Sequence, residues 1–406
     1  MEPLLIVGVI LFTGFVLGEV ASQVKLPKVT GYILAGVILN PNVCGYISAD
    51  FVNTTSFVTN IALAFITFSV GGTLFYPRIK RLGKQIIFIG LFESELVFLL
   101  LFVGLLAVTP VLIEIPGGTL FTAFIPLSLL LASLGSPTDP SATLAVKHEY
   151  KAQGDVSNTI MGITAFDDAL GIINYSIAAS IASLLILSEA LTVHSSLLHP
   201  LVTIFGAVIL GALFGFLFNI ISTFIKRETE GTYIVVILSL LLVCFSIATI
   251  IELDGLLSTM TMGAVVVNFN PLRKKIFRIM ERYTEELIFV FFFTLSGMHL
   301  DFGVLTSSYL LIIFFVVFRA FGKFIGTFTG AHTSRSPYKV KKYVAGGLIP
   351  QGGVVIGLAL LLKQKYAFDE ISNIVISVII GATIVHEFIG PVLAKIALTR
   401  AGEIKS

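Results

Sequence analysis

Two adjacent aspartates, Asp167 and Asp168, lie near the middle of a long apolar segment that contains no basic residue. An ionisable group at membrane depth costs roughly 3 kcal/mol, so it usually faces a cavity and marks an ion or proton path. Consecutive helix positions point about 100° apart. One carboxylate can therefore face an aqueous funnel while the other faces a neighbouring helix. The pair predicts a site for a cation and protons. The alternative is a neutral, buried aspartate whose hydrogen bonds only stabilise the helix packing.

A second apolar segment, near residues 308–330, offers partner charges for these carboxylates. Lys323 is flanked by Gly322 and Gly326, which allow close helix approach. A buried lysine would seek a carboxylate, so we expect Lys323 to pair with the aspartates. Arg319 lies one turn earlier on the same face. It could be a second partner, or its side chain could snorkel to the membrane interface.

Two further segments are interrupted by small residues and prolines, at 135–140 and at 349–353. A matched pair of interrupted helices is the best sequence indication of a transporter site at the membrane midplane; the alternative is two ordinary proline kinks. Thr138 offers oxygen atoms to an alkali ion, because hard cations prefer oxygen ligands. We expect Asp139 to balance a half-helix dipole or to lie next to the ion, rather than to coordinate the ion directly. Gln351 is expected to hydrogen-bond freed backbone groups.

Other charges within apolar segments give weaker signals. Glu93 and Glu95 are expected to pair with Arg319 or with other polar groups. His386 and Glu387 occupy the last apolar segment, where a structural bond to a broken helix is favoured over ion binding.

The composition is that of a membrane protein. Of the 406 residues, 56% are hydrophobic and 12% are charged, whereas a soluble protein has about 25% charged residues. A membrane-spanning helix needs about 20 apolar residues, and the sequence predicts thirteen such segments. They are 4–22, 28–41, 56–75, 85–108, 118–135, 156–186, 199–224, 232–251, 255–269, 285–300, 308–330, 343–362 and 370–397.

The distribution of Lys and Arg predicts how the chain is oriented. With thirteen spans, 22 of the 26 Lys and Arg residues fall on one side, and only Lys363 and Lys365 on the other. Basic loops are cytoplasmic. We therefore expect the cell (inner) membrane, with the N-terminus outside and the C-terminus in the cytoplasm. The expected organisation is a single transmembrane transporter domain, 1–397, followed by a short cytoplasmic tail, 398–406.

An odd number of spans favours two inverted repeats around a linker helix. Repeat one would cover about 4–186, the linker helix 199–224, and repeat two 232–397. The predicted fold class is thus an all-α membrane protein with two inverted six-helix repeats and crossed discontinuous helices. In this scheme the two interrupted segments are repeat counterparts. So are the segment of Asp167 and Asp168 and that of His386 and Glu387.

These residues resemble the monovalent cation:proton antiporter superfamily, in particular the NapA-like Na⁺/H⁺ antiporters of the sodium/hydrogen exchanger family. The resemblance covers nearly the whole chain. It includes the stretch 26–41, the stretch 68–74, the aspartate pair and Lys323. It implies that Asp168 is the main carrier of Na⁺ (or Li⁺) and H⁺, and that Asp167 alternates between Lys323 and the ion path. It also implies a homodimer and an elevator-like movement of the core helices.

Within that superfamily the motifs are mixed. Asp167 and Lys323 favour the electrogenic branch, whereas Thr138-Asp139-Pro140 looks like the electroneutral one. Electrogenic Na⁺(Li⁺)/H⁺ antiport is the leading prediction. K⁺/H⁺ antiport and electroneutral Na⁺/H⁺ exchange remain alternatives, as does a sodium-coupled organic-solute symporter. An intramembrane aspartyl protease needs its carboxylates on separate helices, so we expect no enzyme. We also expect no cofactor, no nucleic-acid partner and no metal other than Na⁺ at Asp167 and Asp168.

Overall fold

The computed structural model describes residues 2–24, 28–139, 143, 146–147, 150–187, 199–224, 230–300 and 302–404. Within these residues the regular structure is entirely helical. Pro140 and the pair Leu26-Pro27, which the sequence analysis singled out, lie outside the described residues.

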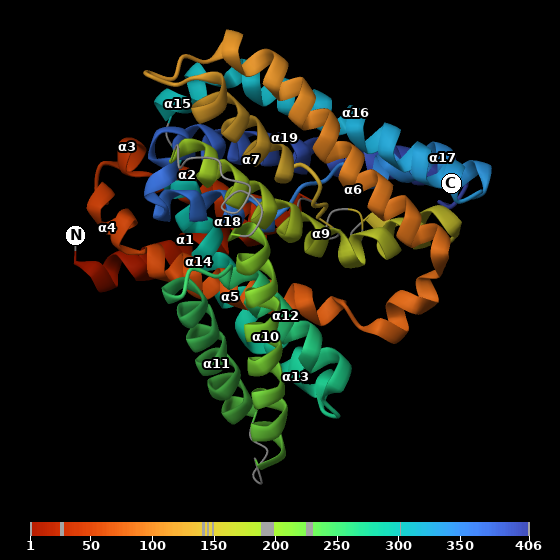
Figure 1. Ribbon diagram of the computed structural model, residues 1–406, viewed down its shortest axis with the longest axis horizontal. Coiled ribbons are helices and arrows are strands. Elements are labelled where there is room, and N and C mark those ends of the chain that lie inside the picture. The colour runs from red at the N-terminus through yellow and green to blue at the C-terminus, as the bar shows by residue number, and fades with distance from the viewer. Residues whose placement is uncertain are drawn as a thin grey trace.

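The helices follow one another through the whole chain (Figure 1). Their bounds are α1 (Pro3–Gln23), α2 (Lys28–Ile38), α3 (Pro41–Cys44), α4 (Ala49–Thr54), α5 (Ser56–Thr73), α6 (Tyr76–Leu112), η1 (Leu120–Phe124), α7 (Ile125–Ser133), α9 (Asp155–Ile186), α10 (His199–Phe224), α11 (Glu230–Ile250), α12 (Gly255–Phe269), α13 (Arg273–Met280), η3 (Glu281–Glu285), α14 (Glu286–Met298), α15 (Phe302–Ser307), α16 (Tyr309–Thr333), α17 (Tyr338–Tyr343), η4 (Val344–Gly347), α18 (Gly353–Leu361), η5 (Leu362–Gln364), η6 (Tyr366–Phe368) and α19 (Asp369–Arg400).

Each of the thirteen predicted segments coincides with helical structure. Among the described residues, seven helices are long and apolar enough to cross a membrane. They are Pro3–Gln23, Gly83–Leu112, Asp155–Ile186, Val202–Thr223, Glu230–Ile250, Tyr309–Thr333 and Tyr366–Arg400. Several others, such as Gly255–Phe269 and Glu286–Met298, are apolar but shorter. The number of thirteen crossings and the inverted repeats remain predictions.

The helices pack in two groups. The first, which we call the site bundle, contains α6, α7, α9, α16 and α19. The second, the scaffold bundle, contains α1, α2, α5, α10, α11, α12 and α14. In Figure 1 the site bundle lies across the upper part of the molecule, and α10 and α11 of the scaffold bundle extend downward. The short helix α18 contacts α19 and α9 of the first group as well as α5 and α14 of the second.

Close packing of α16 on α6 follows from a row of glycines in α16. A Cβ added at Gly322 would meet Val97, one at Gly326 would meet Glu93, and one at Gly330 would meet Ile89. The spacing of four residues keeps the glycines on one face. Because residue numbers rise along α16 while those of the contacted residues in α6 fall, the two helices are antiparallel. Small residues let backbones approach closely in a membrane. The row therefore brings the middle of α6 next to Lys323.

The helix that carries the two aspartates is anchored at its beginning. The carboxylate of Glu403 accepts hydrogen bonds from the amides of Val156 and Ser157, at 2.6 and 2.9 Å. A negative charge stabilises the first turn of a helix. From this anchor α9 continues for 32 residues, about 48 Å, which is enough to cross a bilayer with tilt.

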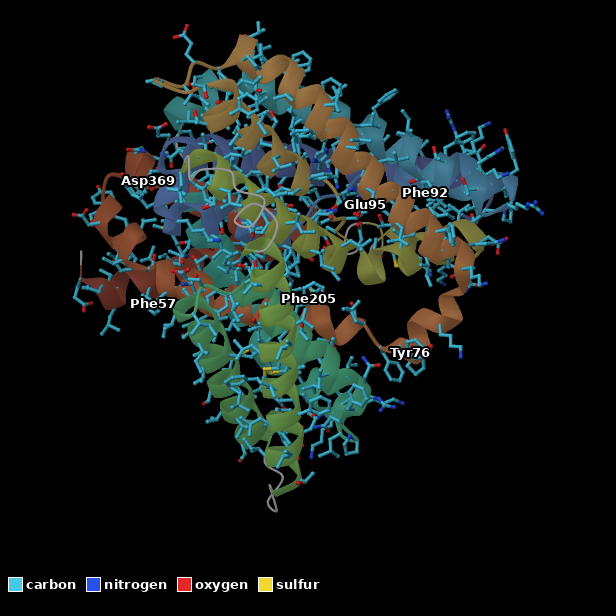
Figure 2. All side chains as sticks on the ribbon, viewed as in Figure 1. Phe57, Tyr76, Phe92, Glu95, Phe205 and Asp369 are labelled. Atoms are coloured by element: carbon cyan, nitrogen blue, oxygen red, sulfur yellow. The ribbon has the colours of Figure 1, made fainter. Side chains whose placement is uncertain are left out.

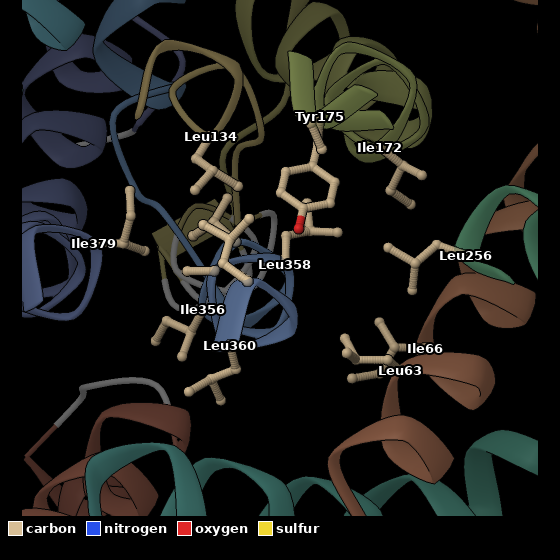
Figure 3. Close-up of a cluster of buried hydrophobic side chains, with 14 of the residues drawn as sticks. Leu63, Ile66, Leu134, Ile172, Tyr175, Leu256, Ile356, Leu358, Leu360 and Ile379 are labelled. Atoms are coloured by element: carbon tan, nitrogen blue, oxygen red, sulfur yellow. The ribbon is translucent and has the colours of Figure 1, made fainter. Parts of the chain in front are cut away.

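The apolar core surrounds α18. Figure 3 shows Ile356, Leu358 and Leu360 of this helix among side chains from several others. The neighbours labelled in the picture are Leu134, Ile172, Tyr175, Ile379, Leu63, Ile66 and Leu256. Because α18 is short, packing contacts such as these hold it in place. The apolar core thereby determines the position of the non-helical segment that precedes α18.

Candidate functional site

Asp167 and Lys323 meet in the interior of the site bundle. The Lys323 Nζ atom lies 3.6 Å from Asp167 Oδ2, and both side chains are fully buried. Neither carboxylate oxygen of Asp167 has a hydrogen-bond partner among the described residues. The structure thus brings together the two residues that the sequence analysis paired. The distance leaves the carboxylate of Asp167 outside normal hydrogen-bonding range.

Asp168 occupies a different environment from its neighbour. Its side chain is partly exposed, whereas that of Asp167 is buried. It interacts electrostatically with Asp167, Asp139 and Lys323. The helix geometry therefore separates the two carboxylates as expected: one faces Lys323, and the other remains accessible.

Lys323 also holds the chain that follows α7. Its ammonium donates to the carbonyl of Ser136 at 2.5 Å and to Thr138 Oγ1 at 2.8 Å. Thr138 in turn donates to the carbonyl of Leu348 at 3.4 Å. Thr138 thus lies at the site, as an ion ligand would, but its hydroxyl is engaged by Lys323 here.

Arg319 is buried between the two interrupted segments. Its guanidinium donates to the carbonyls of Gly135 at 2.7 Å, Ile349 at 2.6 Å and Pro137 at 2.8 Å. The side chain has no exposed area, which excludes the alternative that it snorkels to an interface. Three carbonyls freed by the chain breaks converge on one cation, which replaces the missing helical hydrogen bonds. Arg319 therefore fastens one interrupted segment to the other.

Gln351 makes a further bond of the same kind. Its Nε2 donates to the carbonyl of Leu134 at 2.8 Å, at the end of α7, as expected of a residue that satisfies freed backbone groups. Its Oε1 lies 2.9 Å from His386 Nδ1 on α19. The bond of α19 to a broken segment, which the sequence analysis favoured, thus goes through His386.

Asp139 lies against the second interrupted segment, with Glu387 beside it. The amide of Asp139 donates to the carbonyl of Pro350 at 3.1 Å. A Cβ added at Gly352, which precedes α18, would meet the Asp139 side chain. A carboxylate at this position, near the N-terminus of α18, is placed to balance the helix dipole; the role that the sequence analysis expected for Asp139 stays a prediction. Glu387 is buried beside Asp139 and accepts a hydrogen bond from Thr30 at 3.4 Å.

Glu93 is the member of this site that sequence reasoning missed. It was expected to pair with Arg319 or with other polar groups, and the partner proves to be Lys323: Oε1 of Glu93 forms an ion pair with Lys323, and both side chains are fully buried. The signal was present in the glycine row of α16, because Gly326 packs on Glu93. Apolar segments do not reveal which helix faces which, so this signal could not be used. Glu95, two residues later, is exposed and accepts a bond from Asn174 at 3.3 Å instead.

Around the two interrupted segments, acidic side chains outnumber basic ones. Among the described residues, five carboxyl groups gather there, those of Glu93, Asp139, Asp167, Asp168 and Glu387, around the two cations Arg319 and Lys323. Burying unpaired charge is costly. The arrangement therefore favours additional positive charge, supplied by protons or by a cation bound to the carboxylates.

Buried ionisable groups at two crossing chain breaks, within a bundle of apolar helices, define a class of protein: the ion-coupled secondary transporters. The comparison with known families agrees. The model described as the transmembrane sodium/hydrogen exchanger matches residues 7–396, and the chain belongs to this family.

The relatives compared here are distant in sequence. The structure of the sodium proton antiporter MjNhaP1 from Methanocaldococcus jannaschii matches with a TM-score of 0.77 at 18% identity, over 98% of each chain; this likeness concerns the fold. The Na⁺/H⁺ antiporter NhaP of Pseudomonas aeruginosa is 25% identical over 72% of this chain and 74% of its own. Cation/H⁺ antiporter 19 of Arabidopsis thaliana is 22% identical over 83% of this chain. That match spans only 43% of the plant protein.

Proposed function

We propose that this protein exchanges Na⁺ or Li⁺ for H⁺ across the cell membrane, with Asp168 as the main carrier. One observation carries the proposal: a partly exposed carboxylate stands beside a buried one whose oxygens have no hydrogen-bond partner among the described residues. An ionised carboxylate can bind a proton or a cation, but not both at once. Competition for Asp168 and Asp167 couples the two ions.

Oxygen atoms near the aspartates would complete the coordination of a bare Na⁺. Carboxylates, hydroxyls and carbonyls are the ligands that hard cations prefer. Thr138 lies within reach, since Lys323 bonds to it and also approaches Asp167. Because the hydroxyl of Thr138 also accepts from Lys323, we infer that a cation at this position would weaken that bond.

Alternating access would move this site between the two sides of the membrane. Arg319, Gln351 and the amide of Asp139 tie the broken segments to each other. We infer that these segments move together with the aspartates as one unit, and that the scaffold bundle remains in place. We also propose that the protein is a homodimer. Its N-terminus lies outside and its C-terminus in the cytoplasm.

We further propose that transport is electrogenic, with two protons exchanged for each Na⁺. Both aspartates would be ionised around the cation and both protonated after its release, so one net charge moves in each cycle. A potential of 100 mV would then contribute about 2.3 kcal/mol to the driving force. In the alternative, one-for-one exchange, no net charge moves and the voltage contributes nothing to the driving force.

Proteoliposomes that contain the purified protein test these proposals. With a pH gradient imposed, addition of Na⁺ or Li⁺ should collapse the gradient, and K⁺ should not. If K⁺ is the better substrate, the protein is a K⁺/H⁺ antiporter. If none of the three ions moves protons, the proposed function is wrong.

A second measurement uses K⁺ and valinomycin to impose a voltage without a pH gradient. Na⁺ flux that follows the voltage supports electrogenic exchange. Flux that responds to a pH gradient but not to voltage would establish electroneutral exchange instead.

A further inference from the structure

A pocket lies between the end of α16 and the short helix α17. Its volume is about 460 Å³, and its lining residues are Phe324, Ile325, Phe328, Tyr338, Lys341 and Lys342. The three apolar side chains come from α16, and the tyrosine and the two lysines come from α17. The pocket therefore joins an apolar wall to a basic one, and it shares no lining residue with the candidate ion site.

The apolar wall is part of a strip along α16. Ile313, Val317, Phe321, Phe324 and Phe328 recur at spacings of three or four residues, and each is between 45% and 58% exposed. Successive residues of a helix point about 100° apart, so this strip lies opposite the glycine row that packs on α6. An exposed apolar strip on a membrane-spanning helix contacts the acyl chains of lipids. The pocket lies where this strip reaches α17.

The basic wall is positioned by the packing of α17. Val340 is buried in an apolar cluster with Ala331 and Val344, which anchors this helix beside the end of α16. Tyr338 and Lys342 remain exposed. Tyrosine is enriched at the membrane–water interface, where its ring lies against apolar groups and its hydroxyl reaches water. The lysines beside Tyr338 are thus at the level of the lipid headgroups.

Among the described residues, the two lysines of the pocket have no acidic partner. No carboxylate there forms an ion pair with Lys341 or Lys342. The ammonium of Lys342 lies 5.5 Å from the ring centre of Tyr338 and from that of Tyr343. Lys28, in contrast, is paired with two glutamates. Basic residues next to a membrane helix attract anionic lipids, so the pocket offers uncompensated positive charge to a headgroup.

We propose that this pocket binds an anionic phospholipid, whose phosphate accepts hydrogen bonds from Lys341 and Lys342 and whose acyl chain lies along the apolar strip of α16. A free anion would leave the apolar wall unused, and a second copy of the chain on this face would bury two lysines. Because the lining residues lie on α16 and α17, the lipid is attached to the helix that also contains Arg319 and Lys323. Such binding is independent of the proposed exchange of Na⁺ for H⁺.

Native mass spectrometry of the purified, delipidated protein tests the headgroup. Phosphatidylglycerol and phosphatidylcholine with identical acyl chains are added in turn, and the dissociation constant of the first bound lipid is measured. We expect the wild type to prefer phosphatidylglycerol. The Lys341→Gln/Lys342→Gln variant should lose this preference by about thirtyfold, since each lysine near an anionic headgroup strengthens binding about fivefold.

The matched control is the variant Arg335→Gln/Lys339→Gln. It removes two exposed cations from the same end of the molecule, neither of which lines the pocket, so it should keep the wild-type preference. An equal loss in both double variants would mean that the basic surface in general attracts the lipid, and it would overturn the proposal. So would a wild-type protein that binds the two lipids equally.

The Phe328→Ala variant tests the apolar wall. Shortening this side chain should weaken phosphatidylglycerol binding at least about fourfold, the contribution of one buried methylene group. Phe205→Ala is the control. Phe205 is 62% exposed on α10 of the scaffold bundle, apart from α17 (Figure 1 and Figure 2), and its truncation should leave binding unchanged. Equal effects of the two substitutions would contradict an acyl chain in this pocket.

Two further outcomes distinguish the occupants. Inorganic phosphate in large excess should not displace phosphatidylglycerol; displacement would show an anion site that needs no lipid, and the proposal would be wrong. The same spectra give the oligomeric mass. If the lysine variant changes that mass and still binds phosphatidylglycerol as the wild type does, a second copy of the chain occupies the pocket instead. None of these measurements involves transport, so the proposed cation exchange is tested separately.

Discussion

The site bundle and the scaffold bundle differ in what they bury. Every acidic or basic side chain that is fully buried among the described residues lies on α6, α9, α16 or α19 of the site bundle: Glu93, Asp167, Arg319, Lys323, His386 and Glu387. The scaffold bundle is held by other means. Gly71 packs on Met260, Gly263 packs on Phe68, and the hydroxyls of Thr67 and Thr259 lie 2.6 Å apart.

This difference separates two tasks within one membrane protein. Helices in lipid can associate through close packing of small residues and through hydroxyl bonds, so a scaffold needs no buried charge. Charges at membrane depth are costly and occur where ions or protons pass. Substitutions of the carboxylates in the site bundle should therefore change transport, and those in the scaffold bundle should change stability alone.

The sharpest test of this comparison is Asp168→Asn. The amide cannot bind a proton or balance a cation, so we expect exchange to disappear while the protein stays folded. The Asp254→Asn variant is the control in the scaffold bundle. Asp254 caps α12 by accepting from the Leu257 amide at 2.8 Å, and asparagine caps equally well. Proteoliposome antiport at a near wild-type rate in Asp168→Asn would exclude this residue as the carrier.

Arg319→Met should produce the next largest effect, on stability. The substitution removes donors from the carbonyls of Gly135, Pro137 and Ile349, and each buried unpaired group costs about 1–3 kcal/mol. We expect a total loss of at least ~3 kcal/mol, seen as a lower Tm of the detergent-solubilised protein. Arg278→Met removes an exposed arginine from α13 and should change the Tm little. Equal Tm values for the two variants would contradict the clamping role of Arg319.

Gly263→Ala tests the scaffold bundle. The added Cβ would meet the backbone carbonyl of Phe68 on α5, which cannot move without shifting the helix. Overpacking costs about 1–3 kcal/mol, so the Tm should fall, while the folded fraction keeps the wild-type ratio of protons to Na⁺. Gly8→Ala has open space around its Cβ and should be neutral. A changed ratio in Gly263→Ala would show that the scaffold bundle takes part in coupling.

The smallest expected effect is the change in apparent Na⁺ affinity for each pH unit, caused by competition between Na⁺ and protons. Below the pH at which the carrier carboxylates titrate, each pH unit should weaken apparent Na⁺ affinity about tenfold for every competing proton, or about 1.4 kcal/mol. Antiport rates measured against Na⁺ concentration at a series of pH values give this dependence. An affinity that is constant from pH 6 to 9 would speak against shared carboxylates.

Much of the fold could be predicted from the sequence alone. Long apolar runs determine helices because no backbone group can stay unbonded in lipid, and the thirteen predicted segments all coincide with helices. The prolines and glycines at 135–140 and 349–353 fix where helices break. The pair Asp167-Asp168 and Lys323 were evident because charge is rare at membrane depth. Their roles in transport remain predictions.

Only the tertiary structure decided the partners of Glu93 and Arg319. The sequence places Glu93 and Arg319 within apolar segments, and their partners depend on how α6, α16 and the two interrupted segments pack. Glu93 reaches Lys323 because Gly326 lets α16 approach α6. Arg319 stays inside because both chain breaks direct carbonyls at it. An apolar pattern indicates that a helix faces protein or lipid. Which side chains pair between two helices depends on how those helices are aligned against each other.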